Sequence, residues 1–259
     1  MRLFLLALLF SGVLQAETFD HQHRTWTRLL ERHVVWLSSG HASVVDYSGF
    51  QQDMDELETY LNELSAVPSD EYRRWQVSQR LAFLINAYNA FTVKLVTDHY
   101  PVGSIKDIGG LFSSPWRQAF IPLLGQTLSL DQIEHSLIRE PGVFDEPRIH
   151  FAVNCASVGC PALRNEAFVA ERLDEQLEDS QRRFLSDQSR NRFDPIRQRL
   201  QISKIFDWYG EDFSREWGSL ENYFNQHLTL LSPSTKQYTP QKKLRIEYLD
   251  YDWSLNDKG

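Results

Sequence analysis

Residues 81–96 read LAFLINAYNAFTVKLV, and no other stretch beyond the N-terminal segment is as apolar. Apolar side chains would cover nearly every side of a helix formed by these residues, which is typical of a helix buried in a core. Pro101, Val102 and Gly103 follow and are expected to end this helix. The sequence therefore predicts a buried helix at residues 81–96 as part of the core.

Shorter elements are predicted on both sides of this helix. Apolar residues recur at helical spacing, and amphipathic helices are expected, at residues 26–37, 50–65, 129–137, 167–185 and 213–231. Strands are expected near residues 44–45, on either side of residues 124–125, and at residues 149–153, 200–203 and 244–248, with a loop at residues 186–197. These elements predict a helix-rich α+β fold in a single domain, in which helices pack a small, mostly antiparallel sheet of about three to five strands.

The N-terminal segment MRLFLLALLFSGVLQAET has the pattern of a secretory signal peptide at residues 1–16. Its apolar run, Leu3 to Phe10, is shorter than the roughly 20 residues that span a membrane. We therefore expect cleavage after Ala16, export to the periplasm or the medium, and no stable membrane insertion of the mature protein. Residues 17–25 are expected to form a flexible lead-in, and residues 26–259 a single globular domain.

Composition excludes several classes of function. The formal net charge of −8 argues against a nucleic-acid-binding protein, which needs a basic surface. Two cysteines are too few for a disulfide-built scaffold or for a zinc site made of four cysteines. The chain contains no phosphate-binding loop and no calcium-loop pattern. We expect a monomer without metal or cofactor, which acts on an unidentified small molecule or peptide.

Both cysteines lie in the stretch HFAVNCASVGCPALR, residues 150–164. Cys155 follows the predicted strand and is a candidate nucleophile, because loops held by rigid strands often carry reacting groups. Alternation along that strand would place His150 and Asn154 on one face and Cys155 on the other. His135, on the preceding helix, is therefore the preferred base for the thiol, with His150 as second candidate and Asn154 positioned to orient His150.

Two other interpretations of the cysteines remain open. A spacing of four residues between Cys155 and Cys160 allows a disulfide if the loop turns back on itself. A thiol–disulfide redox couple is also possible, although the spacing differs from the C-x-x-C of thioredoxin-like proteins. If the disulfide forms, Cys155 carries no free thiol.

Polar residues within the buried helix are further candidates. Asn86 and Asn89 lie on one stripe of an otherwise apolar helix. Buried amides must be hydrogen-bonded, so they either tie the helix to a neighbouring loop or line a pocket beside Cys155. The complete set of expected pocket residues is Asn86, Tyr88, Asn89, Ser157, Cys160 and Asp252.

Several motifs occur together in a characteristic order: LINAYNAFTVKLV, SIKDIGG, SLDQIEHSLIR, PRIHFAVNCASVGCPALR, RLDEQLEDSQRRFLSD, ISKIFDWYGEDF and YDWSLN. With them the chain resembles the family known as domain of unknown function 547, as an exported bacterial member. The resemblance implies which positions are typical of the family, namely Asn86, Tyr88, Asn89, His135, His150, Asn154, Cys155, Ser157, Cys160, Pro161 and Asp252. It implies no reaction, because a family resemblance does not give a mechanism.

The function expected from these residues is that of a thiol-dependent hydrolase or acyl transferase acting on an amide or ester. Cys155 would attack and His135 would accept its proton, while backbone N–H groups after Cys155 would hold the oxyanion. The first alternative is a non-catalytic periplasmic binding or scaffold domain with a Cys155–Cys160 disulfide. The second is a thiol–disulfide redox protein.

Overall fold

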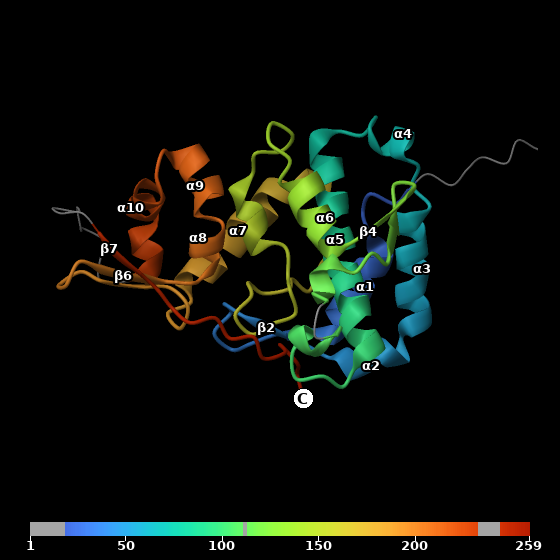
Figure 1. Ribbon diagram of the computed structural model, residues 1–259, viewed down its shortest axis with the longest axis horizontal. Coiled ribbons are helices and arrows are strands. Elements are labelled where there is room, and N and C mark those ends of the chain that lie inside the picture. Colours follow the sequence, from blue (N-terminus) through green and yellow to red (C-terminus); the bar gives the residue numbers. More distant parts are fainter. Residues whose placement is uncertain (1–18, 111–112, 233–243) are drawn as a thin grey trace, which may run out of the picture.

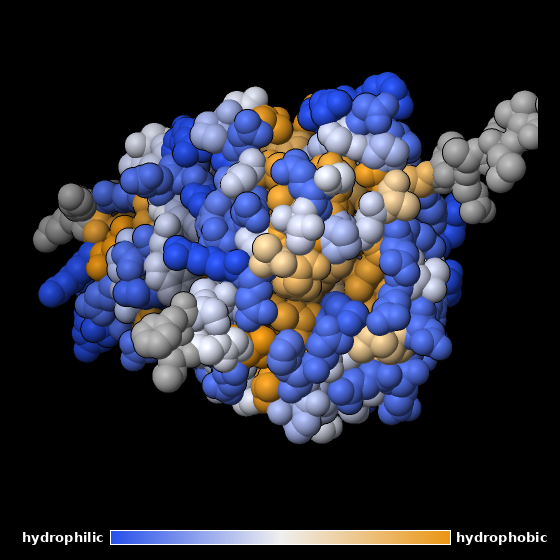
Figure 2. All heavy atoms as spheres, turned by 45° about the vertical axis from the view of Figure 1, so that its right-hand side comes forward, coloured by the Kyte–Doolittle hydropathy of each residue, from blue (hydrophilic) through white to orange (hydrophobic). Residues whose placement is uncertain are grey.

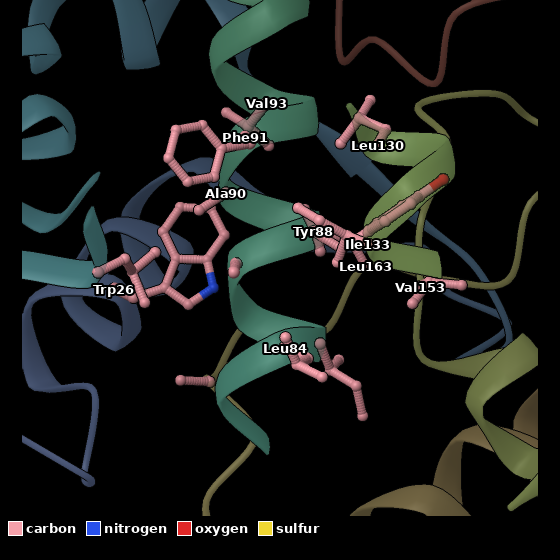
Figure 3. Close-up of a cluster of buried hydrophobic side chains, with 14 of the residues drawn as sticks. Trp26, Leu84, Tyr88, Ala90, Phe91, Val93, Leu130, Ile133, Val153 and Leu163 are labelled. Atoms are coloured by element: carbon pink, nitrogen blue, oxygen red, sulfur yellow. The ribbon is translucent and has the colours of Figure 1, made fainter. Parts of the chain in front are cut away.

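The fold is built around helix α5 (Val77–His99), which the computed structural model places in the centre of the larger of two apolar clusters. The structure describes residues 19–110, 113–232 and 244–259. Figure 3 shows Trp26 on one side of α5 and Leu130, Ile133 and Val153 on the other. The buried helix predicted at residues 81–96 is confirmed, and it extends further at both ends.

Two helices near the N-terminus, α2 (Tyr47–Gln52) and α3 (Met54–Ser65), pack against α5, and α1 (Arg24–His33) packs against both of them. The short α4 (Ser69–Tyr72) leads back into α5. The helix predicted at residues 26–37 is too long, because the chain leaves α1 at His33 and becomes strand β1 (Val34–Trp36). β1 pairs antiparallel with β2 (Ser43–Val45), the strand predicted near residues 44–45. Valine-rich segments favour a pleated strand over a helix end.

The predicted pair of strands around residues 124–125 is confirmed as the hairpin β3 (Ile121–Leu123) and β4 (Gln126–Leu128). Leu124 and Gly125 both have positive φ, 53° and 78°, as a two-residue hairpin turn that matches the strand twist requires. Ser129 and Gln132 then form the capping box that starts α6 (Leu130–Gln132). The chain continues directly into η3 (Ile133–Ile138), a π-helical turn.

A second apolar cluster lies beyond α7 (Leu173–Ser186), on the α8–α10 side of Figure 1. It is formed by the C-terminal end of α7, the helices α8 (Ile205–Trp208), α9 (Gly210–Trp217) and α10 (Leu220–Leu231), and the strands β5 (Arg192–Asp194), β6 (Arg199–Ile202) and β7 (Arg245–Tyr248). The short turn η5 (Ala170–Arg172) precedes α7 and contacts α5. The loop predicted at residues 186–197 therefore contains a strand. The helix predicted at residues 213–231 is two helices, because Gly218 adopts φ 75° between them.

The predicted fold class, a helix-rich α+β fold, is confirmed, and the strands of the described residues are divided among three small sheets. β5 and β6 pair antiparallel, whereas β6 and β7 pair in parallel. After β7 the chain returns toward α2, as Figure 1 shows in red. On the way, the carbonyl oxygens of Asp252 and Ser254 accept hydrogen bonds from the N–H groups of Gly159 and Val158. The C-terminal segment therefore connects the second cluster to the first.

The strand predicted at residues 149–153 is wrong. The segment forms the 3₁₀ turn η4 (Pro147–Phe151), with Pro147 at its start and the Glu146 side chain accepting a hydrogen bond from the N–H of Arg148. Pro fixes φ near −65° and suits the first position of a helical turn. Since the segment is helical, the argument from alternating strand faces does not apply to His150, Asn154 and Cys155.

The N-terminal lead-in also differs from the expectation over its described part. Phe19 stacks on Trp75 with ring centroids 5.3 Å apart, and His23 is buried with its Nδ1 2.7 Å from the Tyr60 hydroxyl. The signal peptide predicted at residues 1–16 lies outside the described residues.

The outer surface is mixed in polarity. Figure 2 shows one face on which hydrophilic residues surround a band of apolar ones. Among the helices that the structure describes, none combines the length and the apolarity needed to cross a membrane.

Candidate functional site

A cavity of about 470 Å³ lies where the two apolar clusters meet, a volume typical of sites for small molecules. Its polar and charged lining residues include Arg117, Asp131, Glu134, His135 and His150. Its aromatic lining residues are Tyr88, Trp116, Trp208, Tyr209, Tyr251 and Trp253. Cys155 and Cys160 complete the wall. The cavity thus combines large apolar surfaces with a few converging polar groups.

Glu134 is the buried carboxylate of this cavity, with 6% of its surface exposed. It lies in the π-helical turn η3, a type of irregularity that is frequent at functional sites. The hydroxyls of Tyr88 and Tyr209 are near enough to interact with its carboxylate. No Lys, Arg or His nitrogen of the described residues lies within ion-pairing distance of its carboxylate. Glu134 therefore forms no direct ion pair among the described residues, although the Arg139 guanidinium is near enough to interact with its charge.

The two tyrosines remain donors at neutral pH. Burial, with the nearby Glu134 carboxylate as a second cause, raises the pKa of Tyr88 far above its usual value. The same two causes raise the pKa of Tyr209. Both hydroxyls therefore keep their protons at neutral pH and can donate to the carboxylate.

A chain of charged groups lies beside Glu134. His150 Nε2 is 2.8 Å from Asp212 Oδ2, and Arg139 Nε donates to the same oxygen at 2.7 Å. Burial alone would raise the pKa of Asp212, but the hydrogen bonds from His150 and Arg139 outweigh it and lower the pKa. Arg139 also lies 2.6 Å from His135 Nδ1. Asp212 is thus the centre of this chain, although sequence reasoning did not single it out.

The imidazole of His150 is buried and stacked on Tyr209, with ring centroids 4.0 Å apart. Burial lowers its pKa and outweighs the opposing effect of Asp212, so the ring is neutral. With Nε2 bonded to Asp212, Nδ1 is left buried and without a hydrogen-bond partner among the described residues. Asp212, and not Asn154 as predicted, orients this histidine.

Cys155 and Cys160 form a disulfide, with Cα atoms 6.3 Å apart. This is the pairing that the sequence left open, and Cys155 in this form carries no free thiol. The Cys155 sulfur has the hydroxyls of Ser157 and Tyr251 as neighbours, each at 3.3 Å. His135, the predicted base, is exposed, with one ring nitrogen facing Arg139 and the other 3.6 Å from Asp131. Both residues line the cavity, but no imidazole of the described chain is hydrogen-bonded to sulfur.

The three predicted asparagines form hydrogen bonds to backbone groups and thereby hold segments of the chain near the cavity in place. The Asn86 side chain makes two hydrogen bonds to the backbone of Phe168: it donates to the carbonyl oxygen at 2.7 Å and accepts from the N–H at 3.0 Å. Asn89 donates to the Ala152 carbonyl at 2.9 Å and accepts from the Asn154 N–H at 2.8 Å. Asn154 in turn holds the cysteine loop, donating to the carbonyl of Pro161 and accepting from the N–H of Ala156.

Not all of the remaining predicted pocket residues line the cavity. Tyr88 and Cys160 line the cavity, and Ser157 touches both sulfurs. Asp252 is exposed and does not line it, although its carbonyl oxygen holds Gly159. Glu134 was missed, yet the pattern carried a signal: it lies four residues after Leu130 and four before Ile138, in the apolar stripe of its helix.

Metal-ligating side chains are not grouped in the described ranges: nowhere do three His, Cys, Asp or Glu residues come together as a metal ion would need. Within the cavity, the sulfurs are bonded to each other and His150 Nε2 is held by Asp212. Polar groups of the cavity wall that are available to a ligand include Glu134, Arg117 and His150 Nδ1.

Comparison with known proteins gives a family but no reaction. Residues 72–185 match the family model described as a protein of unknown function, DUF547. No curated protein and no solved structure matches the chain. The matched range contains α5, Glu134, His150 and both cysteines, whereas Asp212 and the aromatic residues Trp208, Tyr209, Tyr251 and Trp253 lie after it. The resemblance found in the sequence motifs is confirmed over residues 72–185, which match the DUF547 family model.

Proposed function

We propose that this protein is an exported binding protein for a small organic cation, an amine with an apolar body, which occupies the cavity between the two clusters. The observation that carries the proposal is Glu134, a buried carboxylate in the cavity wall that forms no direct ion pair with a Lys, Arg or His of the described residues. Export rests on the signal-peptide pattern of residues 1–16.

The charge of Glu134 is the first argument. Removing a carboxylate from water costs several kcal/mol, and hydrogen bonds from neutral groups offset only part of this cost. Tyr88 and Tyr209 supply donors but no charge. A ligand ammonium group that contacts the carboxylate would supply the missing charge, and it would do so in a site from which water is largely displaced. Charge complementarity therefore favours a cation over an anion of equal size.

The aromatic wall is the second argument. Tyr251 and Trp253 lie with ring centroids 4.5 Å apart, and Trp208 lies 4.9 Å from Tyr251. Aromatic faces attract cations and also cover the apolar body of a ligand. Protein cations already lie over two of the lining rings: Lys106 Nζ is 3.6 Å from the centroid of Trp253, and the Arg139 guanidinium is 4.9 Å from that of Tyr209.

Binding is preferred over thiol-dependent hydrolysis because of the state of the sulfur. In the disulfide Cys155 has no thiolate to attack an amide or ester, and its polar neighbours are hydroxyls and not an imidazole. The proposal therefore follows the alternative of a binding domain with a Cys155–Cys160 disulfide.

The test compares three ligands of one size and different charge: hexylamine, hexanol and hexanoate. Titration calorimetry with the purified protein should give the tightest binding for hexylamine and no measurable binding for hexanoate. Glu134→Gln should weaken hexylamine binding by about tenfold or more, since it removes one charged contact, and leave hexanol binding unchanged. Glu31→Gln, at an exposed position of α1, is the matched control and should change neither. Equal affinities for the three ligands, or an unaffected Glu134→Gln variant, would refute the proposal.

A further inference from the structure

The two sulfurs of the disulfide lie in unequal surroundings. Cys160 is buried, with 5% of its surface exposed, whereas Cys155 is only partly buried. Both residues line the cavity, so a small molecule inside it meets the disulfide directly. A nucleophile that enters the cavity therefore has freer access to Cys155.

Hydrogen-bond donors gather around the buried sulfur. The backbone N–H of Cys155 lies 3.0 Å from Cys160 Sγ, the Tyr251 hydroxyl 3.2 Å and the Ser157 hydroxyl 3.4 Å. The N–H contact belongs to Cys160 alone, while the two hydroxyls also touch Cys155. Burial raises the pKa of Tyr251 to about 12, so its hydroxyl stays protonated at neutral pH. These donors are placed where a thiolate on Cys160 would be stabilised.

Hydrogen bonds hold the loop in addition to the disulfide. The Asn154 side chain donates to the Pro161 carbonyl at 2.8 Å and accepts from the Ala156 N–H at 2.8 Å, which closes the loop at its base. The N–H groups of Val158 and Gly159 bind carbonyl oxygens of the C-terminal segment, each at 2.8 Å. A covalent bond across so short a loop adds only about 2 kcal/mol by restricting the unfolded chain. Structural reinforcement is thus a weak reason for the disulfide.

We propose that the Cys155–Cys160 disulfide is a reactive couple that exchanges with a small thiol admitted to the cavity, with Cys155 as the attacked sulfur and Cys160 as the leaving group. The incoming thiolate forms a bond to Cys155 Sγ. The Cys155–Cys160 bond breaks, and its electron pair stays on Cys160 as a thiolate, which receives the N–H of Cys155 and the hydroxyl of Tyr251. A leaving thiol of low pKa departs faster, so these donors accelerate the step.

A second thiol completes the reaction. It attacks the external sulfur of the mixed disulfide on Cys155, the external disulfide leaves, and Cys155 becomes a thiolate that is then protonated. Two thiols are oxidised to one disulfide while the protein disulfide is reduced to two thiols, and the reverse sequence restores it. The cavity volume restricts the reactants to small thiols and disulfides and excludes folded proteins. The exchange does not require the amine ligand proposed above.

The first test compares the two single-cysteine variants with hydroxyethyl disulfide, the oxidised form of β-mercaptoethanol. In Cys160→Ser, mass spectrometry should show rapid formation of one adduct, on Cys155. In Cys155→Ser, the adduct on the buried Cys160 should form about tenfold more slowly or less, because the reagent has poorer access. Faster modification of Cys160 than of Cys155 would overturn the assignment of the attacked sulfur.

The second test follows reduction of the intact disulfide by β-mercaptoethanol, with alkylation of the released thiols at each time. Reduction of the folded protein should be faster than global unfolding, and Tyr251→Phe should slow it by about three- to tenfold through loss of one donor to the leaving thiolate. Tyr248→Phe makes the same change on β7, on a side chain with no contact to sulfur among its described interactions, and should have no effect. If native reduction proceeds only at the unfolding rate, the disulfide is structural and the proposal fails.

Glu134→Gln separates this proposal from the binding function. It should not slow the reaction with β-mercaptoethanol, because the attacking thiolate is an anion and the substitution removes a carboxylate that repels it. If the disulfide exchanges but hexylamine is not bound selectively, the reactive couple is retained and the amine site is refuted. If hexylamine is bound selectively but the disulfide does not exchange in the folded protein, the amine site is retained and the reactive couple is refuted.

Discussion

Replacement of Asn89 by alanine should strongly destabilise the fold, because this side chain holds two buried backbone groups at once. Asn89 is 2% exposed on α5. Its amide donates to the Ala152 carbonyl at 2.9 Å and its oxygen accepts from the Asn154 N–H at 2.8 Å. Ala152 and Asn154 are themselves buried, so no water replaces the lost partner. Each unsatisfied buried group costs about 1–3 kcal/mol, so the expected loss is about 2–5 kcal/mol.

Urea unfolding followed by fluorescence measures this loss. For a slope of about 2–3 kcal/mol per M, the midpoint should fall by about 1–2 M. Asn62→Ala, at an exposed position of α3, makes the same chemical change without buried partners and should shift the midpoint little. A change for Asn89→Ala no larger than for this control would show that the hydrogen bonds to residues 152 and 154 do not hold the site segment to α5.

Three further predictions concern pH, the disulfide and export. Burial lowers the pKa of His23 to about 3 and also lowers that of His150, so each binds its proton more weakly in the folded than in the unfolded state. The contribution of these two neutral histidines to stability is complete above their unfolded-state pKa near 6.5, and it falls by up to about 1.4 kcal/mol per pH unit for each histidine as the pH drops below that value. Urea midpoints should therefore fall from pH 7 to pH 5. His23→Gln should make the midpoint depend less on pH. Reduced, alkylated protein should remain folded and lose only about 2 kcal/mol of unfolding free energy; unfolding on reduction would contradict the loop's independent hydrogen bonding. N-terminal sequencing of the exported protein should begin at Glu17, and an intact Met1 would exclude cleavage after Ala16.

The sequence was sufficient where a pattern was long or chemically distinctive. The segment at residues 81–96 is apolar on every side and longer than a strand, so α5 was recoverable from periodicity. The hairpin at residues 121–128 and the capping box at Ser129 were recoverable because Gly125, Ser129 and Gln132 have local roles. Local chemistry decides these elements, and local chemistry is visible in sequence.

The sequence failed where an element is short or its partner is distant. Residues 149–153 are a brief apolar run, which periodicity cannot assign to strand or helix, and the deciding signal was Pro147 just before it. The orientation of His150 depends on Asp212, 62 residues later, and no local pattern links them. The loop that carries Cys155 and Cys160 is held in the folded protein by Asn154 and by hydrogen bonds to the distant C-terminal segment. Tertiary contacts decide these features, so local sequence patterns do not predict them.

The return of the chain after β7 imposes an order on assembly. Tyr251 and Trp253, which form one wall of the cavity, follow every other lining residue in the chain. They are held by contacts of long sequence separation, such as that between the N–H of Val158 and the carbonyl of Ser254, and contacts of this kind form late in folding. Cys155 and Cys160, in contrast, are close neighbours in the chain and can be oxidised before that segment docks. Formation of the disulfide therefore does not show that the cavity is complete. A measurement that depends on docking of the C-terminal segment, such as tryptophan fluorescence, is needed to follow the completion of the cavity.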